Sequence, residues 1–371
     1  MKRKILLLLG LGILIRILLA LGTFHSDIEH FLLAGRVIAQ GNILNFYDSS
    51  KIVFNYPPLV YFFLGPLSYI LTIPFNKFIY LPFDLGVAFL LFKLFKEPKE
   101  KLWALVLWMF NPLVLFATYM MGQFDIIPTF LVISAFYLVF RKKSYLLAAV
   151  LLGLGASFKI FPFLFLVPLA LLSEKWPDRL KIVGLGLLTY FVTILPFINS
   201  SGFRATALVA SQTTKSLYAA LPISGGEAIV LFPLAVTLLY IFFWYRTNTP
   251  ETLWQKFFVL LLVFFVFTHY HPQWLLWLTP FLIIDLIKSR FNHWPLTVLS
   301  LTSWTGLLTF FDPGLSVRLF APVFPALKNL PGIWEIFGIN VDMNFARSLL
   351  QTLFVAPALY WIYYYFPKKE T

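Results

Sequence analysis

The stretch Phe24 to Pro58 reads FHSDIEHFLLAGRVIAQGNILNFYDSSKIVFNYPP and directly follows the first long apolar segment of the chain. The residues on either side of it are mostly apolar, yet it contains Asp27, Glu29 and Asp48 together with two histidines. It ends in an Asn-Tyr-Pro-Pro sequence, which is typical of a turn. This concentration of polar groups beside apolar segments indicates a loop with a chemical function.

The composition predicts that this loop belongs to a membrane protein. Hydrophobic residues make up 60% and charged residues 12% of the 371 residues, whereas soluble proteins contain roughly 25% charged residues. A spanning helix needs roughly 20 mainly apolar residues, and about twelve such segments fit this chain. We therefore predict an all-α polytopic integral membrane protein with about twelve transmembrane helices, forming a single domain over residues 1–371.

Basic residues predict the orientation of these helices. The predicted helices are 4–22, 78–95, 102–120, 124–140, 144–158, 160–173, 180–198, 227–245, 255–268, 272–287, 294–311 and 346–366. With the N-terminal Lys-Arg-Lys sequence in the cytoplasm, most of the 29 Lys and Arg residues lie on the cytoplasmic side, as the positive-inside rule requires. Both termini are therefore predicted to be cytoplasmic, and the positive charge is an orientation signal, with no nucleic acid as partner.

One apolar run, Leu59 to Ile73, is not counted as a crossing because it is short and is interrupted by proline. A run of about 15 residues is typical of an interfacial or re-entrant helix. Residues 23–77 then form one long outer loop with interfacial helices, and the outer loops 199–226 and 312–345 cover the same face. The compact loops favour a prokaryotic plasma membrane, and an ER-type membrane is the alternative.

Five polar motifs interrupt the apolar segments, and all five fall on the predicted outer side. They are Asp27-Ile28-Glu29, Tyr56-Pro57-Pro58, Gly122-Gln123-Phe124-Asp125, Lys159-Ile160-Phe161-Pro162 and His269-Tyr270-His271-Pro272. The cytoplasmic loops are too short for a nucleotide-binding module, and no glycine-rich phosphate loop of the usual spacing is present. Any chemistry is therefore expected at the outer face.

The order of these motifs resembles the GT-C superfamily of membrane glycosyltransferases, in particular the GPI mannosyltransferase I and GT87 types. Asp84-Leu85 and Asn111-Pro112 add to the likeness, which covers residues 1 to 175 and 270 to 282. The resemblance implies transfer of a hexose, with mannose favoured over glucose, from a polyprenyl-phosphate donor to a lipid or glycan acceptor. It implies no cofactor.

The same resemblance implies that Asp27 is the catalytic base. A carboxylate with an ordinary pKa of about 4 does not ionise a hydroxyl in the ground state, but it can accept the proton late in an oxocarbenium-like transition state. Glu29 is the second catalytic candidate. Its alternative is structural, because Ser26 and Glu29 have the spacing of a capping box at a helix start.

Four residues other than histidine are candidates for substrate binding. Lys159 is predicted to neutralise the phosphate of the carrier, although many lysines near a membrane simply extend to the headgroups. Gln123 and Asp125 occupy a tight outer turn, where turn formation alone is the alternative to a role with sugar or phosphate. Tyr56 is grouped with them, and its neighbouring double proline favours a part in shaping the loop.

His269 and His271 are the remaining substrate-binding candidates, because an imidazole can donate a hydrogen bond to phosphate. If the segment is extended, the alternation with Tyr270 directs only one of them inward. A metal site made from these two residues with His25, His30 and Asp27 is not predicted, because no spacing among them is a ligand motif.

The ionisable pair Arg16 and Asp84 lies within apolar helices, where such groups are usually paired or functional. We interpret the pair as a structural bridge. Trp274 and Trp277, with Trp304 and Trp334, are interpreted mainly as interfacial anchors.

Two other function classes stay open from the sequence. A transporter or lipid flippase predicts ionisable residues near the middle of the membrane and two-fold internal repetition, whereas the polar motifs here gather on one face. An oligosaccharide ligase or polymerase would share the lipid carrier, and only substrate data separate it from a transferase of single sugars.

Overall fold

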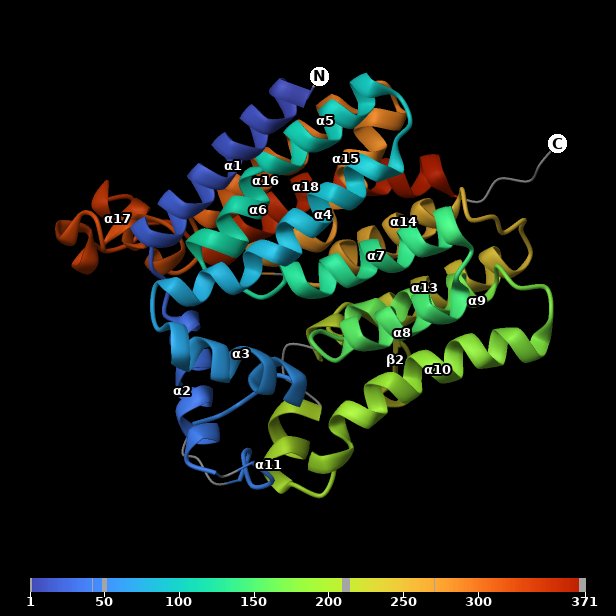
Figure 1. Cartoon of the computed structure of the whole chain (residues 1–371), viewed down its shortest axis with the longest axis horizontal. Coiled ribbons are helices and arrows are strands. Elements are labelled where there is room, and N and C mark those ends of the chain that lie inside the picture. The colour runs from blue at the N-terminus through green and yellow to red at the C-terminus, as the bar shows by residue number, and fades with distance from the viewer. Residues whose placement is uncertain (1, 42, 49–51, 209–213, 270, 367–371) are drawn as a thin grey trace. The chain divides into compact units, whose positions relative to one another are not determined.

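The computed structural model describes residues 2–41, 43–48, 52–208, 214–269 and 271–366, and most of them are helical (Figure 1). The predicted all-α class is therefore confirmed. One small addition is a hairpin of two three-residue strands, β1 (Ala220–Pro222) and β2 (Ala228–Val230), which pair antiparallel. The chain divides into two compact units, and each unit is built from segments that are distant in the sequence.

The first unit comprises Met1–Leu32, Ile70–Ile126 and His271–Ala358. Its elements are α1 (Lys2–Gly22), the start of α2 (Asp27–Ala39), η1 (Phe75–Tyr80), α4 (Leu81–Leu94), α5 (Pro98–Met109), α6 (Pro112–Val114), η2 (Leu115–Met120), η8 (Pro272–Trp277), α15 (Thr279–Lys288), α16 (Trp294–Leu308), η9 (Pro313–Leu315), η10 (Val317–Phe320), η11 (Pro325–Asn329), α17 (Ile333–Ile336) and most of α18 (Met343–Tyr365).

The second unit comprises Leu33–Tyr69, Ile127–Tyr270 and Leu359–Thr371. Besides the end of α2 and the hairpin, its elements are α3 (Pro58–Leu71), α7 (Ile126–Lys142), α8 (Tyr145–Ala156), η3 (Phe161–Phe165), α9 (Leu166–Ala170), α10 (Trp176–Ile194), η4 (Leu195–Phe197), α11 (Ser201–Phe203), η5 (Arg204–Leu208), η6 (Lys215–Leu217), η7 (Ser224–Gly226), α13 (Leu231–Trp244) and α14 (Leu253–Phe267).

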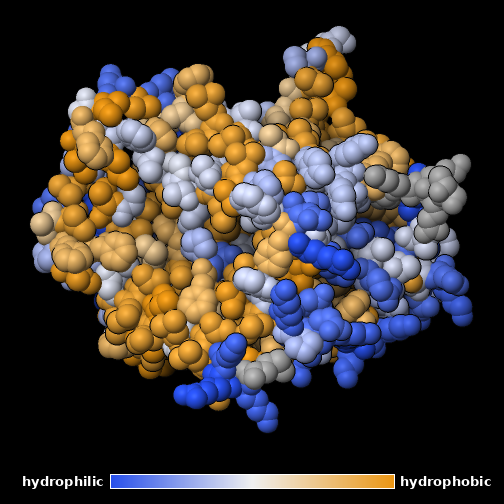
Figure 2. Space-filling view, turned by 90° about the horizontal axis from the view of Figure 1, so that it is seen from above, coloured by the Kyte–Doolittle hydropathy of each residue, from blue (hydrophilic) through white to orange (hydrophobic). Residues whose placement is uncertain are grey.

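Four helical stretches in the described residues are long and apolar enough to cross a membrane: Lys2–Gly22, Pro98–Met120, Trp176–Phe197 and Met343–Tyr365. Shorter apolar helices accompany them, and apolar side chains cover much of the face drawn in Figure 2. The protein is therefore an integral membrane protein. Each helix predicted from the sequence has a helical counterpart, but several are shorter than expected, and the number of about twelve crossings stays a prediction.

Proline accounts for one of these shorter helices. The predicted helix 102–120 divides at Asn111-Pro112, because proline lacks the backbone N–H that would continue α5. The Asn111 side chain accepts a hydrogen bond from the Leu113 N–H at 3.0 Å and so caps the next turn. A π-helical turn, η2, follows and leads directly to the Gly122 turn.

The predicted bridge between Arg16 and Asp84 is confirmed in the core of the first unit. The guanidinium Nε lies 2.5 Å from Asp84 Oδ2, and both side chains are fully buried. Trp108 Nε1 donates to Asp84 Oδ1 at 2.7 Å, and the Tyr119 hydroxyl donates to Oδ2 at 2.6 Å. A buried ion pair is stable only when its remaining hydrogen-bonding capacity is also used, and this network provides that.

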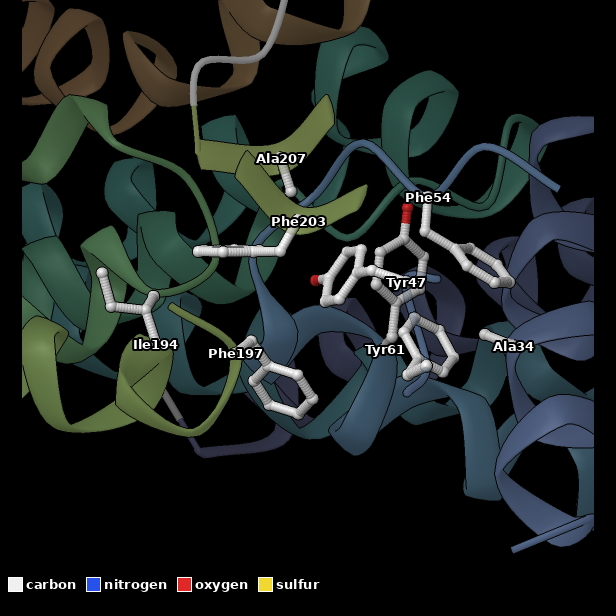
Figure 3. Close-up of a cluster of buried hydrophobic side chains, with 9 residues drawn as sticks. Ala34, Tyr47, Phe54, Tyr61, Ile194, Phe197, Phe203 and Ala207 are labelled. Atoms are coloured by element: carbon white, nitrogen blue, oxygen red, sulfur yellow. The ribbon is translucent and has the colours of Figure 1, made fainter. Parts of the chain in front are cut away.

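An aromatic cluster forms a core of the second unit (Figure 3). Phe46 and Phe54 stack with ring centroids 4.3 Å apart, and the Tyr61 ring packs on Phe54 at 4.8 Å. Nearby, α2 and α3 approach so closely that a Cβ at Gly35 would lie 2.2 Å from the carbonyl oxygen of Gly65. Glycine is therefore required where these two helices cross.

Candidate active site at the start of α2

The first turn of α2 presents the acidic motif that was predicted to be catalytic. Helix α1 ends at Gly22, and α2 begins at Asp27 after a short connection. The Asp27 N–H donates to Nδ1 of His25 at 3.3 Å, and the Glu29 N–H donates to the Ser26 carbonyl oxygen at 3.0 Å. These bonds place Asp27 in the first turn of α2, at the positive end of the helix dipole.

The predicted capping box is wrong in this structure. Within the described ranges, no hydrogen bond joins the Ser26 side chain to the backbone of Glu29, and the His25 imidazole accepts the Asp27 N–H instead. Glu29 is exposed, so the structure gives it no capping role. The reason is local, because the imidazole lies within hydrogen-bond reach of this helix start.

Asp27 is held from a distant part of the chain by Gln123. The Gln123 side-chain amide donates from Nε2 to Asp27 Oδ2 at 2.5 Å. Gln123 is only 1% exposed, whereas the Asp27 side chain is 43% exposed. One carboxylate oxygen is thus fixed by a buried donor, while the carboxylate as a whole still reaches solvent.

The other end of the Gln123 side chain is left without a partner. Its Oε1 atom is buried and makes no hydrogen bond to any described residue. A buried amide oxygen without a partner is costly. This acceptor therefore favours occupancy by a hydroxyl or a water molecule next to Asp27.

Gly122 allows Gln123 to take this position. Its φ of +73° lies in the left-handed region, which glycine adopts without steric cost. A Cβ at Gly122 would also lie 2.8 Å from Cδ1 of Ile28 on the first turn of α2. Two motifs that are almost 100 residues apart are therefore in direct contact, as their common predicted side suggested.

Asp125, in the same turn as Gln123, is bonded in the interior. Its Oδ1 atom accepts a hydrogen bond from Nε1 of Trp277 at 2.6 Å, and both residues are buried. Trp277 stacks on Trp274 with ring centroids 5.4 Å apart, and Trp274 in turn contacts the His271 ring at 5.3 Å. Asp125 therefore fixes η8, and through the two tryptophans it reaches the candidate His271.

The interpretation as interfacial anchors is wrong for Trp274, Trp277 and Trp304, and it stays a prediction for Trp334. Trp274 and Trp277 are 7% and 5% exposed, and Trp304 is 4% exposed. The Trp304 indole donates to the Pro272 carbonyl oxygen at 3.0 Å. Their hydrogen bonds and stacking are made inside the first unit, because tertiary contacts offer partners that the sequence does not show.

Lys77 is a buried cation that the sequence motifs did not identify. Its ammonium donates to the carbonyl oxygens of Thr23 at 2.7 Å, Ala20 at 3.2 Å and Met120 at 3.4 Å. These carbonyl groups lie at the ends of α1 and η2, where the helix dipole favours a positive charge. Burial lowers the pKa of Lys77 to about 7. The side chain joins the connection that carries Asp27 to the turn that carries Gln123.

Three predicted site residues belong to the second unit. The Tyr56 carbonyl oxygen accepts from the Tyr47 hydroxyl at 2.7 Å, and the Tyr56 N–H donates to the Tyr61 hydroxyl at 3.2 Å, which agrees with a part in shaping the loop. Lys159 follows α8 and is half-buried, and His269 follows α14 and is exposed. The predicted alternation around Tyr270 lies outside the described residues.

Comparison with known proteins decides the family. The sequence model of glycosyltransferase family 87 matches residues 54–268, which is more than half of the chain. The chain belongs to glycosyltransferase family 87. The resemblance that the motifs indicated is therefore confirmed. The matched region contains the Gly122 turn and Lys159, whereas Asp27 precedes it.

Curated relatives of this family 87 protein are described as mannosyltransferases. It is 27% identical over 210 residues to GPI mannosyltransferase 1 of Eremothecium gossypii, which covers 52% of this chain and 51% of the relative. It is 32% identical over 177 residues to GPI mannosyltransferase 1 of Trypanosoma brucei brucei, covering 44% and 40%. A third relative is the GPI alpha-1,4-mannosyltransferase I catalytic subunit of Danio rerio, 29% identical over 206 residues, covering 52% and 50%. The chain thus spans about half the length of the curated relatives it matches.

The family 87 protein shows no metal cluster in the part of the chain that the structure describes. No group of three or more His, Cys, Asp or Glu side chains there is placed to hold a metal ion. The described residues of the site provide an oriented, partly exposed carboxylate with a neighbouring imidazole.

Proposed function

We propose that this family 87 protein transfers a hexose, with mannose favoured, from a polyprenyl-phosphate carrier to a lipid-linked or glycolipid acceptor. The observation that carries the proposal is the hydrogen bond from Gln123 to Asp27. It orients a single partly exposed carboxylate at a helix start, in a chain whose relatives are described as mannosyltransferases. The resemblance noted in the motifs assigns the role of base to the same carboxylate.

In the proposed reaction, Asp27 accepts the proton of the acceptor hydroxyl. That oxygen forms a bond to C1 of the hexose as the bond between C1 and the phosphate oxygen breaks, so the configuration at C1 is inverted. Gln123 occupies Asp27 Oδ2, which leaves the other carboxylate oxygen for the hydroxyl. Such a positioned base typically contributes about 10²- to 10⁴-fold to the rate.

The leaving phosphate needs positive charge or hydrogen-bond donors as its own charge develops. We propose Lys159 for this role from its motif, with one of His269 and His271 as a donor. Asp125 and Tyr56 are proposed to support the sugar or phosphate site through the turn and the loop that they fix. Glu29, in the same first turn of α2, stays the second catalytic candidate.

We further propose that the reaction takes place on the outer face, with about twelve crossings and both termini in the cytoplasm. The chain contains no cysteine, so single cysteines report sidedness cleanly. Ser26→Cys should react with a membrane-impermeant maleimide in intact cells, whereas Ser144→Cys should react only after permeabilisation. The opposite labelling pattern would overturn the orientation.

The activity is tested with purified protein in lipid nanodiscs. Labelled polyprenyl-phosphate mannose or glucose is supplied with a crude lipid extract, alongside the Asp27→Asn variant. A labelled product made from the mannose donor by the wild type and not by the variant supports the proposal. Movement of the donor between leaflets without reaction would instead identify a flippase, and transfer of a preformed oligosaccharide would identify a ligase.

A further inference from the structure

His25 lies beside the proposed base. Its Nδ1 atom accepts the Asp27 N–H at 3.3 Å and lies 3.6 Å from Asp27 Oδ2. The imidazole is 11% exposed, compared with 43% for the Asp27 carboxylate. A small rotation would direct a protonated Nδ1 to the carboxylate, so the two groups are placed to share one proton.

Charged groups from three elements surround the His25 imidazole. Asp27 lies on α2, Asp312 lies at the start of η9, and Lys77 lies on η1. Burial lowers the pKa of His25, the two carboxylates raise it, and the Lys77 ammonium lowers it further, with burial the largest effect. The imidazole is therefore neutral at neutral pH and able to accept a proton.

The Nε2 edge of the imidazole faces the turn that carries Asp312 and Gly314. Asp312 is exposed, and its Oδ1 atom accepts the Gly314 N–H at 2.7 Å. A Cβ at Gly314 would lie 2.7 Å from this Oδ1 atom and 3.8 Å from Nε2 of His25. The missing side chain at Gly314 thus keeps the Nε2 edge of His25 and the Asp312 carboxylate close together.

We propose that His25 receives the proton that Asp27 removes from the acceptor hydroxyl and passes it to solvent beside Asp312. The carboxyl group turns its protonated oxygen, the one not bonded to Gln123, toward the imidazole, and Nδ1 gains the proton. Nε2 releases its own proton to water, and the imidazole returns to its starting tautomer by rotation or exchange. No electron or further reactant is needed. The inference rests on the proposed function, and it makes His25 a positioning residue that acts through Asp27.

A purely structural role for His25 makes a different prediction. If His25 only caps α2 through its bond to the Asp27 N–H, any side chain with an acceptor near Nδ1 should replace it. Asparagine provides such an oxygen and is a favoured residue at helix starts, but it does not titrate. His25→Asn therefore separates capping from proton transfer.

The direction of the pH effect follows from the charges. The active form needs a neutral His25 beside an ionised Asp27. As pH falls through the pKa of His25, which lies below its ordinary value, the imidazolium forms and occupies the carboxylate, so kcat/KM falls. In His25→Asn no imidazolium can form beside the carboxylate, so the acid limb moves to lower pH.

The test measures the pH profile of kcat/KM for mannose transfer in nanodiscs. His25→Asn should lower the rate at neutral pH by at least about tenfold and move the acid limb to lower pH. His30→Asn, an exposed histidine on the same helix, is the matched control and should keep the wild-type profile. Asp312→Asn keeps the bond to the Gly314 N–H but removes a charge that raises the pKa of His25, so its acid limb should also move to lower pH.

The outcomes separate this inference from the proposed function. If the wild type transfers no hexose, the proposed function fails. If the wild type is active and Asp27→Asn is inactive, but His25→Asn and Asp312→Asn keep the wild-type rate and profile, only the role of His25 is overturned. If His25→Asn does not fold, as judged by size-exclusion chromatography and thermal unfolding, the profile of Asp312→Asn decides alone.

Discussion

Two aspartates in the first unit show how differently the same side chain is used. Asp84 is fully buried, and its two oxygens are bonded by Arg16, Trp108 and Tyr119. Asp27 is 43% exposed and has one oxygen held by Gln123. A carboxylate whose two oxygens both accept hydrogen bonds from the protein stabilises the fold. A carboxylate with one oxygen not bonded in this way can accept a proton. Hydrogen-bond occupancy, more than residue type, distinguishes the structural Asp84 from the proposed base Asp27.

The largest expected effect comes from removing the reactive carboxylate. Asp27→Asn keeps the size of the side chain but removes the base, so hexose transfer should fall by about 10²- to 10⁴-fold. The thermal unfolding temperature should change little, because the side chain is partly exposed. Transfer by the purified variant near the wild-type rate would contradict the assignment of the base.

The second effect concerns stability. Asp84→Asn leaves the buried Arg16 charge without its partner, so the free energy of unfolding should fall by about 3–5 kcal/mol. Denaturation in detergent micelles measures it. Asp178→Asn is the control, since its bridge to Lys181 is exposed and should contribute about 0–1 kcal/mol. Equal stability losses in the two variants would remove the distinction between the buried pair and an ordinary surface pair.

A smaller effect is expected when the orientation of Asp27 is disturbed. Gln123→Met removes the donor to Oδ2 and should lower kcat by about tenfold, because a misplaced reacting group loses its pre-organised geometry. Gln351→Met, on α18 in the same unit, is the control for loss of an amide. A kcat unchanged in Gln123→Met would show that Asp27 is oriented by its own helix alone.

The smallest effect is expected from the turn that carries Gln123. Gly122→Ala forces a left-handed conformation on alanine, which costs about 1–2 kcal/mol, and its Cβ would press on Ile28. Gly10→Ala on α1 meets no atom within 4 Å and should change stability by at most about 1 kcal/mol. If both variants unfold alike, the contact between this turn and α2 is not a constraint on the site.

Part of the site could be predicted from the sequence because its motifs have local signatures. The acidic pair after the first helix and the Gly-Gln-Phe-Asp turn were both placed on the same side by helix counting, and the contact between Asp27 and Gln123 agrees with that placement. Lys77 and Asp312 were not identified as neighbours of His25. Their roles arise from segments tens to hundreds of residues apart, and no local pattern marks them.

The predicted helix boundaries failed where local chemistry opposed the hydropathy pattern. Pro112 interrupts a continuous apolar run, and the paired strands β1 and β2 lie in a region predicted to be an outer loop and a helix start. The Ser224-Gly225-Gly226 sequence between the strands is a turn signal. The hydropathy pattern predicts which segments are apolar more reliably than it predicts where each helix or strand begins and ends.

The sequence by itself determined that this is an all-α membrane protein with polar motifs gathered between apolar segments, because apolar length and charge distribution are local properties. The order of those motifs indicated a resemblance to the family that the comparison then showed. Only the tertiary structure decided that Asp84 is enclosed, that Asp27 remains partly open, and that His25 lies among Asp27, Asp312 and Lys77. Burial and hydrogen-bond occupancy depend on which distant segments meet, and those contacts set the chemistry of each carboxylate.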